Sequence, residues 1–91
     1  MIEKQIEFPK EVLKDKLQAF LEKNGLSVGI KTTLKSKRNA EHWHLKFRKE
    51  KGILEITFLT PTLFILSVHE NRNANWIANY LKEDFWKELN R

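Results

Sequence analysis

The sequence has 91 residues, with no cysteine, three tryptophans, six phenylalanines and a formal net charge of +5. This length supports one hydrophobic core rather than two, so we expect a single domain over residues 1–91. The lack of cysteine excludes disulfides, and the longest apolar segment, residues 63–68 with one serine, falls far short of the ~20 residues that cross a bilayer. Because the acidic N-terminus is also unlike a signal peptide, we expect a soluble, cytoplasmic protein without membrane association.

The positive charge is concentrated in one segment. Residues 31–51 contain eight basic and two acidic side chains, whereas the other seventy residues contain nine basic and ten acidic ones. A local excess of lysine and arginine attracts polyanions such as nucleic-acid backbones. This segment is therefore the first candidate for a binding surface.

The first third of the chain predicts one helix. The sequence leaves the state of residues 1–8 open, where Ile2, Ile6 and Phe8 would anchor a short extended arm. Pro9 suits a first helical turn, and Asn24-Gly25 suits a left-handed end. Between them an apolar stripe recurs at helical spacing, formed by Val12, Leu13, Leu17, Phe20 and Leu21.

The middle of the chain predicts an antiparallel sheet of three or four strands. Segment 26–35 alternates apolar residues with Lys31 and Lys35, which places the lysines on the outer side. Segments 42–48, 53–58 and 63–68 follow as a meander, separated by a loop ending in Gly52 and by the turn Thr60-Pro61-Thr62. Residues 36–41 are polar apart from Ala40, so we expect a mobile loop there.

A last helix follows the polar turn 69–73, with an apolar stripe of Trp76, Ile77, Tyr80, Leu81, Phe85 and Leu89. The predicted fold is thus a two-layer α+β sandwich of order α-β-β-β-β-α, with both helices packed on one face of the meander. That face would carry Trp43, Leu45, Phe47, Leu54, Ile56 and Phe58. The opposite, solvated face would show Lys31, Thr33, Lys35, His42, His44, Lys46, Arg48, Glu55 and Thr57.

Binding of a nucleic acid or another polyanion is the leading functional hypothesis. The candidate residues are Lys31, Lys35, Lys37, Arg38, Lys46, Arg48, Lys49 and Lys51. A solvated sheet face is also the ordinary place for lysines in a small domain, and outward aromatic residues that would stack bases are missing from the meander. The pattern is therefore compatible with a merely solvated face.

The order helix, three strands, helix is similar to that of the double-stranded-RNA-binding domain, which also leaves one sheet face open. The lysine-rich start of that family's last helix has no counterpart here, where the last helix opens with Asn73-Ala74-Asn75-Trp76. Its Gly-Pro-containing first hairpin is missing as well. No residue role is carried over from it.

A histidine pair gives a less favoured metal hypothesis. His42 and His44 are two residues apart on one strand, so both rings project from the same side. The neighbouring lysine and arginine oppose cation binding, and the sequence does not fix a third ligand. The candidates for that ligand are Glu55, Glu41, Glu70 and His69. We assign no metal or other cofactor at this stage.

Catalysis is the least favoured class. The sequence has no cysteine nucleophile, no glycine-rich phosphate loop and no nucleophile elbow. His69-Glu70 beside Arg72 has the chemistry for acid–base work, but the same residues also make an ordinary polar turn. We therefore expect a small non-catalytic binding module.

A protein contact is the main alternative to polyanion binding. Trp86 lies off the stripe of the last helix, about 100° from Phe85. Segment 63–68 is apolar on both sides, so either it is a central strand or Leu63 and Ile65 form an outward patch. In the second case they would form, together with Trp86, an uncovered apolar surface suited to a homodimer or a protein partner. The competing interpretation is that Trp86 packs over the first helix or the N-terminal arm.

Overall fold

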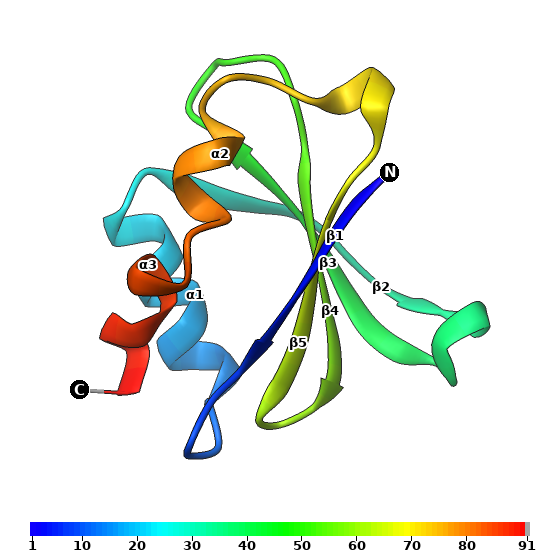
Figure 1. Ribbon diagram of the computed structural model, residues 1–91, viewed down its shortest axis with the longest axis vertical. Coiled ribbons are helices and arrows are strands. Elements are labelled where there is room, and N and C mark those ends of the chain that lie inside the picture. The colour runs from blue at the N-terminus through cyan, green and yellow to red at the C-terminus, as the bar shows by residue number, and fades with distance from the viewer. Residues whose placement is uncertain (91) are drawn as a thin grey trace.

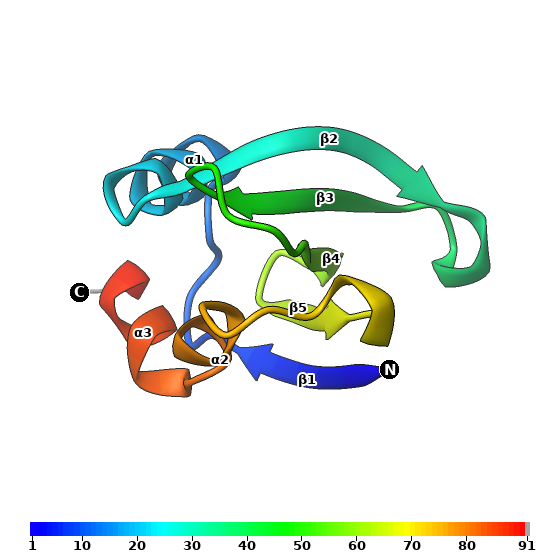
Figure 2. The same cartoon turned by 90° about the horizontal axis from the view of Figure 1, so that it is seen from above.

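Five antiparallel strands form one sheet in the computed structural model, which describes residues 1–90. In space the strands follow the order β1-β5-β4-β3-β2, so the predicted meander lies in the middle and β1 and β2 form the edges (Figures 1 and 2). The strands are β1 (Ile2–Glu7), β2 (Leu26–Leu34), β3 (Ala40–Phe47), β4 (Leu54–Thr60) and β5 (Leu63–Val68). The antiparallel α+β prediction is confirmed, and the N-terminal arm adds a fifth strand paired with β5.

The α-helices lie on one face of the sheet, as predicted (Figure 1). They are α1 (Lys14–Lys23), α2 (Ile77–Tyr80) and α3 (Glu83–Lys87). The chain also has short 3-10 turns, η1 (Lys35–Lys37), η2 (Glu70–Arg72) and η3 (Glu88–Asn90). None of the helices within residues 1–90 has the length and apolar character needed to cross a bilayer.

The core lies between the helices and the sheet. Trp43 and Leu45 of β3 and Ile56 of β4 are almost fully buried there, which confirms the predicted inward face. Burial of each such side chain contributes about 1.5–3 kcal/mol, so this layer dominates the stability. The helices supply matching residues, among them Leu17, Leu21, Ile77 and Trp86.

The first helix begins later than Pro9 suggests. The backbone amides of Phe8 and Val12 donate to the carbonyls of Thr62 and Pro61, at 2.8 and 3.0 Å. These bonds hold the chain against the β4–β5 turn, and α1 starts only at Lys14. The local signal for a helix start was therefore overridden by tertiary hydrogen bonds.

The last helix is broken in two, which corrects the prediction of one continuous helix. Lys82 has an extended backbone (ψ 132°) between α2 and α3. The break turns Trp86 into the core, where it is 1% exposed and its Nε1 donates to the carbonyl of Tyr80 at 2.7 Å. Trp86 is thus a core residue and is not available as a surface contact. Ile65 is also buried, and Leu63 is half-buried.

An irregularity at Gly29 reverses the facing of the second half of β2. Val28 pairs with Leu45 on the helix side, but Ile30 pairs with His44 on the outer side. Because side chains alternate along a strand, one extra residue turns all the residues after it to the opposite face. The sequence alternation predicted no such shift.

This shift moves two residues that were predicted on the outer face to the helix side. Lys31 and Thr33 face the helix layer, and the Lys31 Nζ lies 4.6 Å from the centre of the Trp43 ring and donates to Gln18 Oε1 at 2.7 Å. Lys35 belongs to η1 beyond the end of the strand. The outer face therefore has fewer positive charges than expected.

Candidate functional site

A shallow, open groove lies on part of the outer face of the sheet. The turn between β2 and β3 and the segment around η2 both project on the side away from the helices (Figure 1). Between them lies a groove of about 340 Å³. It is lined by Thr32, Leu34, His42, His44, Glu55, His69, Asn71 and Arg72. On its floor His42 and Glu55 are 3% and 6% exposed, and Thr57 behind His42 is 2% exposed, so these outward side chains are buried polar groups.

Strand register brings these polar side chains together. His42 pairs with Thr57 across β3 and β4, and His44 pairs with Glu55. Side chains of directly opposed residues lie on the same face at about 4.5–5.5 Å between Cβ atoms. His69 follows two residues after Ser67, which is the partner of Glu55 on β5. All three histidines of the chain therefore reach one carboxylate.

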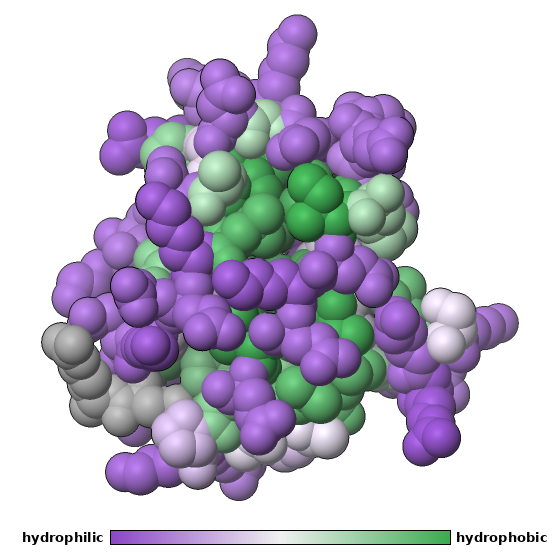
Figure 3. All heavy atoms as spheres, in the orientation of Figure 1, coloured by the Kyte–Doolittle hydropathy of each residue, from purple (hydrophilic) through white to green (hydrophobic). Residues whose placement is uncertain are grey.

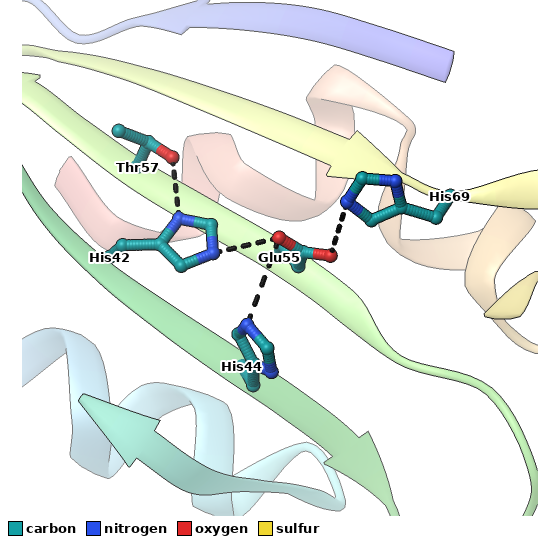
Figure 4. Close-up of polar contacts among 5 residues, drawn as sticks. All are labelled: His42, His44, Glu55, Thr57 and His69. Atoms are coloured by element: carbon teal, nitrogen blue, oxygen red, sulfur yellow. Dashed lines mark hydrogen bonds and ion pairs between the residues drawn. The ribbon is translucent and has the colours of Figure 1, made fainter. Parts of the chain in front are cut away.

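Glu55 is the centre of this cluster (Figure 4). Its Oε1 lies 2.7 Å from the Nε2 of His42 and 3.8 Å from the Nε2 of His44, and its Oε2 lies 3.1 Å from the Nε2 of His69. The Nδ1 of His42 contacts the Thr57 Oγ1 at 2.8 Å. We call these five residues the histidine cluster.

The hydrogen bonds assign a tautomer to His42. A carboxylate only accepts, so the Nε2 of neutral His42 carries the proton and donates to Glu55. The unprotonated Nδ1 then accepts from the hydroxyl of Thr57. Both ring nitrogens are satisfied at a nearly water-free position, as buried polar groups require.

His44 is less tightly held. Its Nε2 is too far from Glu55 for a hydrogen bond, and its side chain is partly exposed. Burial lowers the pKa of His44; the Glu55 carboxylate opposes this effect, and the positive charge of Arg72 adds to it. The ring is therefore uncharged at neutral pH and has a nitrogen lone pair to offer a ligand.

Three of these residues could hold a metal ion. One ligand atom each from His42, His44 and Glu55 lies within 4.8 Å of the other two. The other acidic ligands considered from sequence lie elsewhere. Glu41 accepts from the Lys14 Nζ at 2.9 Å on the helix side, which lowers the pKa of Glu41, and Glu70 pairs with the terminal amine at 3.6 Å.

The order hydroxyl, imidazole, carboxylate in Thr57, His42 and Glu55 is that of a nucleophilic triad. Thr57 is only 2% exposed, however, so a substrate cannot approach its hydroxyl. Its position suits a residue that orients the His42 ring. The cluster therefore offers ligand and proton-binding groups rather than a nucleophile.

The basic residues of segment 31–51 are not gathered on one surface. Lys35, Lys37 and Arg38 lie in the turn before β3, whereas Arg48, Lys49 and Lys51 lie in the loop at its other end. Arg48 has a left-handed backbone (φ 51°), and its guanidinium lies over the Phe47 ring. Of the eight, Lys46 alone projects from the outer face of β3. Polyanion binding stays a prediction, now for two separate basic clusters.

Uncovered apolar residues are dispersed as well. Figure 3 shows apolar areas divided by hydrophilic side chains on the face it presents. The large exposed apolar residues are spread along the chain and are Met1, Ile2, Leu13, Ile30 and Leu59. No residue predicted for a protein interface is among them. Self-association stays a prediction without a defined surface.

Sequence reasoning found His42 and His44, and named Glu55 and His69 among their partners. It missed the role of Thr57 and the place of Arg72 at the groove. The sequence does contain a signal for the side on which His69 lies, because residues 65, 67 and 69 share one side of a strand and its continuation.

Comparison with protein-family models, with curated proteins and with solved structures found no match for this chain.

Proposed function

We propose that this chain is a small binding module that holds one divalent metal ion of the zinc type in the groove. The ligands are His42, His44 and Glu55, and the Nε2 of His69 lies 3.1 Å from the other oxygen of Glu55. The observation that carries the proposal is the convergence of all three histidines on one buried carboxylate.

The donor set suits zinc. Imidazole nitrogen and carboxylate oxygen bind zinc at about 2.0–2.1 Å, and tetrahedral geometry then separates ligand atoms by about 3.3 Å. The distances from Glu55 Oε1 to the two imidazoles, 2.7 Å to His42 and 3.8 Å to His44, lie on either side of this value. All three ligand atoms lie within 4.8 Å of one another, so side-chain rotations would have to draw them together around one ion.

The surroundings also fit a metal ligand. When His42 binds a metal through Nε2, its proton must move to Nδ1, which then donates instead of accepting. The hydroxyl of Thr57 serves both states, since it can donate or accept. His69 lies beside the Oε2 of Glu55 and restrains the carboxylate, as Thr57 restrains the His42 ring.

A zinc titration of dialysed, untagged protein tests the proposal. We expect one ion per chain by isothermal titration calorimetry, and a large loss of affinity in His44→Gln. His44 is the variant of choice because its side chain makes no hydrogen bond within residues 1–90. Glu70→Gln is the control, since Glu70 lies outside the groove lining.

Two results would contradict the proposal. Wild-type protein that takes up no zinc removes the site altogether. Equal zinc affinity in His44→Gln and wild type would place the ion elsewhere.

A further inference from the structure

We propose that the metal ion keeps one coordination position open to the groove and that a small oxyanion, a carboxylate or a phosphate, binds there between the ion and Arg72. This inference rests on the proposed metal site. It assigns a ligand class to the site and a role to the side chain of Arg72.

The open position follows from where the ligands lie. His42 and Glu55 belong to the buried floor, so an ion bound to them is covered from the sheet side. Its other side faces the groove, toward Thr32, Asn71 and Arg72. Three protein ligands leave the fourth tetrahedral position free, which is the usual arrangement at zinc sites that bind an exchangeable ligand. The groove volume of about 340 Å³ admits a small molecule.

The backbone of Arg72 is held in place, whereas its guanidinium has no partner in the part of the chain that the structure describes. Its backbone amide donates to the carbonyl of His69 at 2.9 Å, and its carbonyl accepts from the amide of Ile53 at 3.0 Å. Within residues 1–90 its guanidinium makes no hydrogen bond, ion pair or ring contact, although it lines the groove.

Charge selects an anion. With neutral imidazoles, a divalent ion, the Glu55 carboxylate and Arg72 together carry a net charge of +2 in the groove. The planar fork of an arginine binds two oxygens of a carboxylate or phosphate at once. The Asn71 amide and the Thr32 hydroxyl stand on the same lining and supply further donors. A small oxyanion satisfies the ion and the guanidinium together.

Cobalt-loaded protein tests this inference through the visible spectrum of the ion. We expect inorganic phosphate or acetate, titrated separately, to change the cobalt spectrum saturably. Arg72→Gln should weaken the binding of that anion by about tenfold or more, as expected for loss of a charged hydrogen-bonding partner. Lys46→Gln is the matched control, because it removes one positive charge from the same sheet face outside the groove lining.

The outcomes separate the two proposals. Failure of cobalt to bind in the absence of any added anion contradicts the metal site. A normal cobalt spectrum that neither anion changes overturns only the oxyanion inference. The same holds if Arg72→Gln binds the anion as tightly as Lys46→Gln does.

Discussion

Replacing Thr57 with valine isolates the residue that orients His42. The change keeps the shape of the side chain and removes only the Oγ1 that lies 2.8 Å from the His42 Nδ1. Thr57 is 2% exposed, so water cannot replace the lost partner. The hydrogen bond contributes about 0.5–1.5 kcal/mol, and an unsatisfied buried nitrogen costs about 1–3 kcal/mol. We therefore expect metal-free Thr57→Val to lose about 1–3 kcal/mol in the free energy of unfolding.

The same substitution should weaken zinc binding by about 10–100-fold, the usual effect of removing a group that holds a metal-bound histidine. Urea unfolding without metal and calorimetric zinc titration measure the two effects separately. Thr33→Val is the control, because Thr33 is exposed on β2 and should change stability by less than about 0.5 kcal/mol. If Thr57→Val is as stable as this control and binds zinc equally well, the orienting role assigned to Thr57 is wrong.

Two further predictions concern the fold. Gly52→Ala should destabilise the protein by more than about 1–2 kcal/mol in urea unfolding, because Gly52 has φ +103° and an added Cβ would lie 2.7 Å from the Ala74 Cβ. Gly29→Ala is the control and should cost less, because its Cβ would meet nothing nearer than 3.9 Å. Burial raises the pKa of Tyr80 above its ordinary 10.0, so the folded hydroxyl keeps its proton, and its bond to the Asn24 carbonyl, at a pH where the unfolded chain has lost it. The free energy of unfolding should therefore fall as pH rises above about 10, and it should fall less steeply in Tyr80→Phe. Ultraviolet titration of this sole tyrosine should give a pKa above 10. An ordinary pKa would contradict the burial argument.

The layered fold could be predicted because strand alternation is local. Trp43, Leu45 and Ile56 show their facing directly in the sequence, and the structure confirms it. The shift at Gly29 could not be predicted, since one glycine within an alternating run does not reveal whether it is paired or extra. The break at Lys82 was equally hidden, because the apolar stripe continues through it.

The site was only half predictable for a similar reason. The spacing of His42 and His44 fixes their common side, but their partners depend on the register of β3 against β4 and of β4 against β5. A slip of one residue would have turned Glu55 away from both rings. Arg72 depends on a tertiary bond to Ile53, which no local pattern encodes.

The gathering of every imidazole of the chain in a single groove makes the protein its own spectroscopic probe. Imidazole resonances in a nuclear magnetic resonance spectrum can arise only from His42, His44 and His69, so no background from remote histidines has to be assigned or subtracted. Tautomer, protonation and ligand exchange in the groove can thus be followed on the unmodified chain, without an added label.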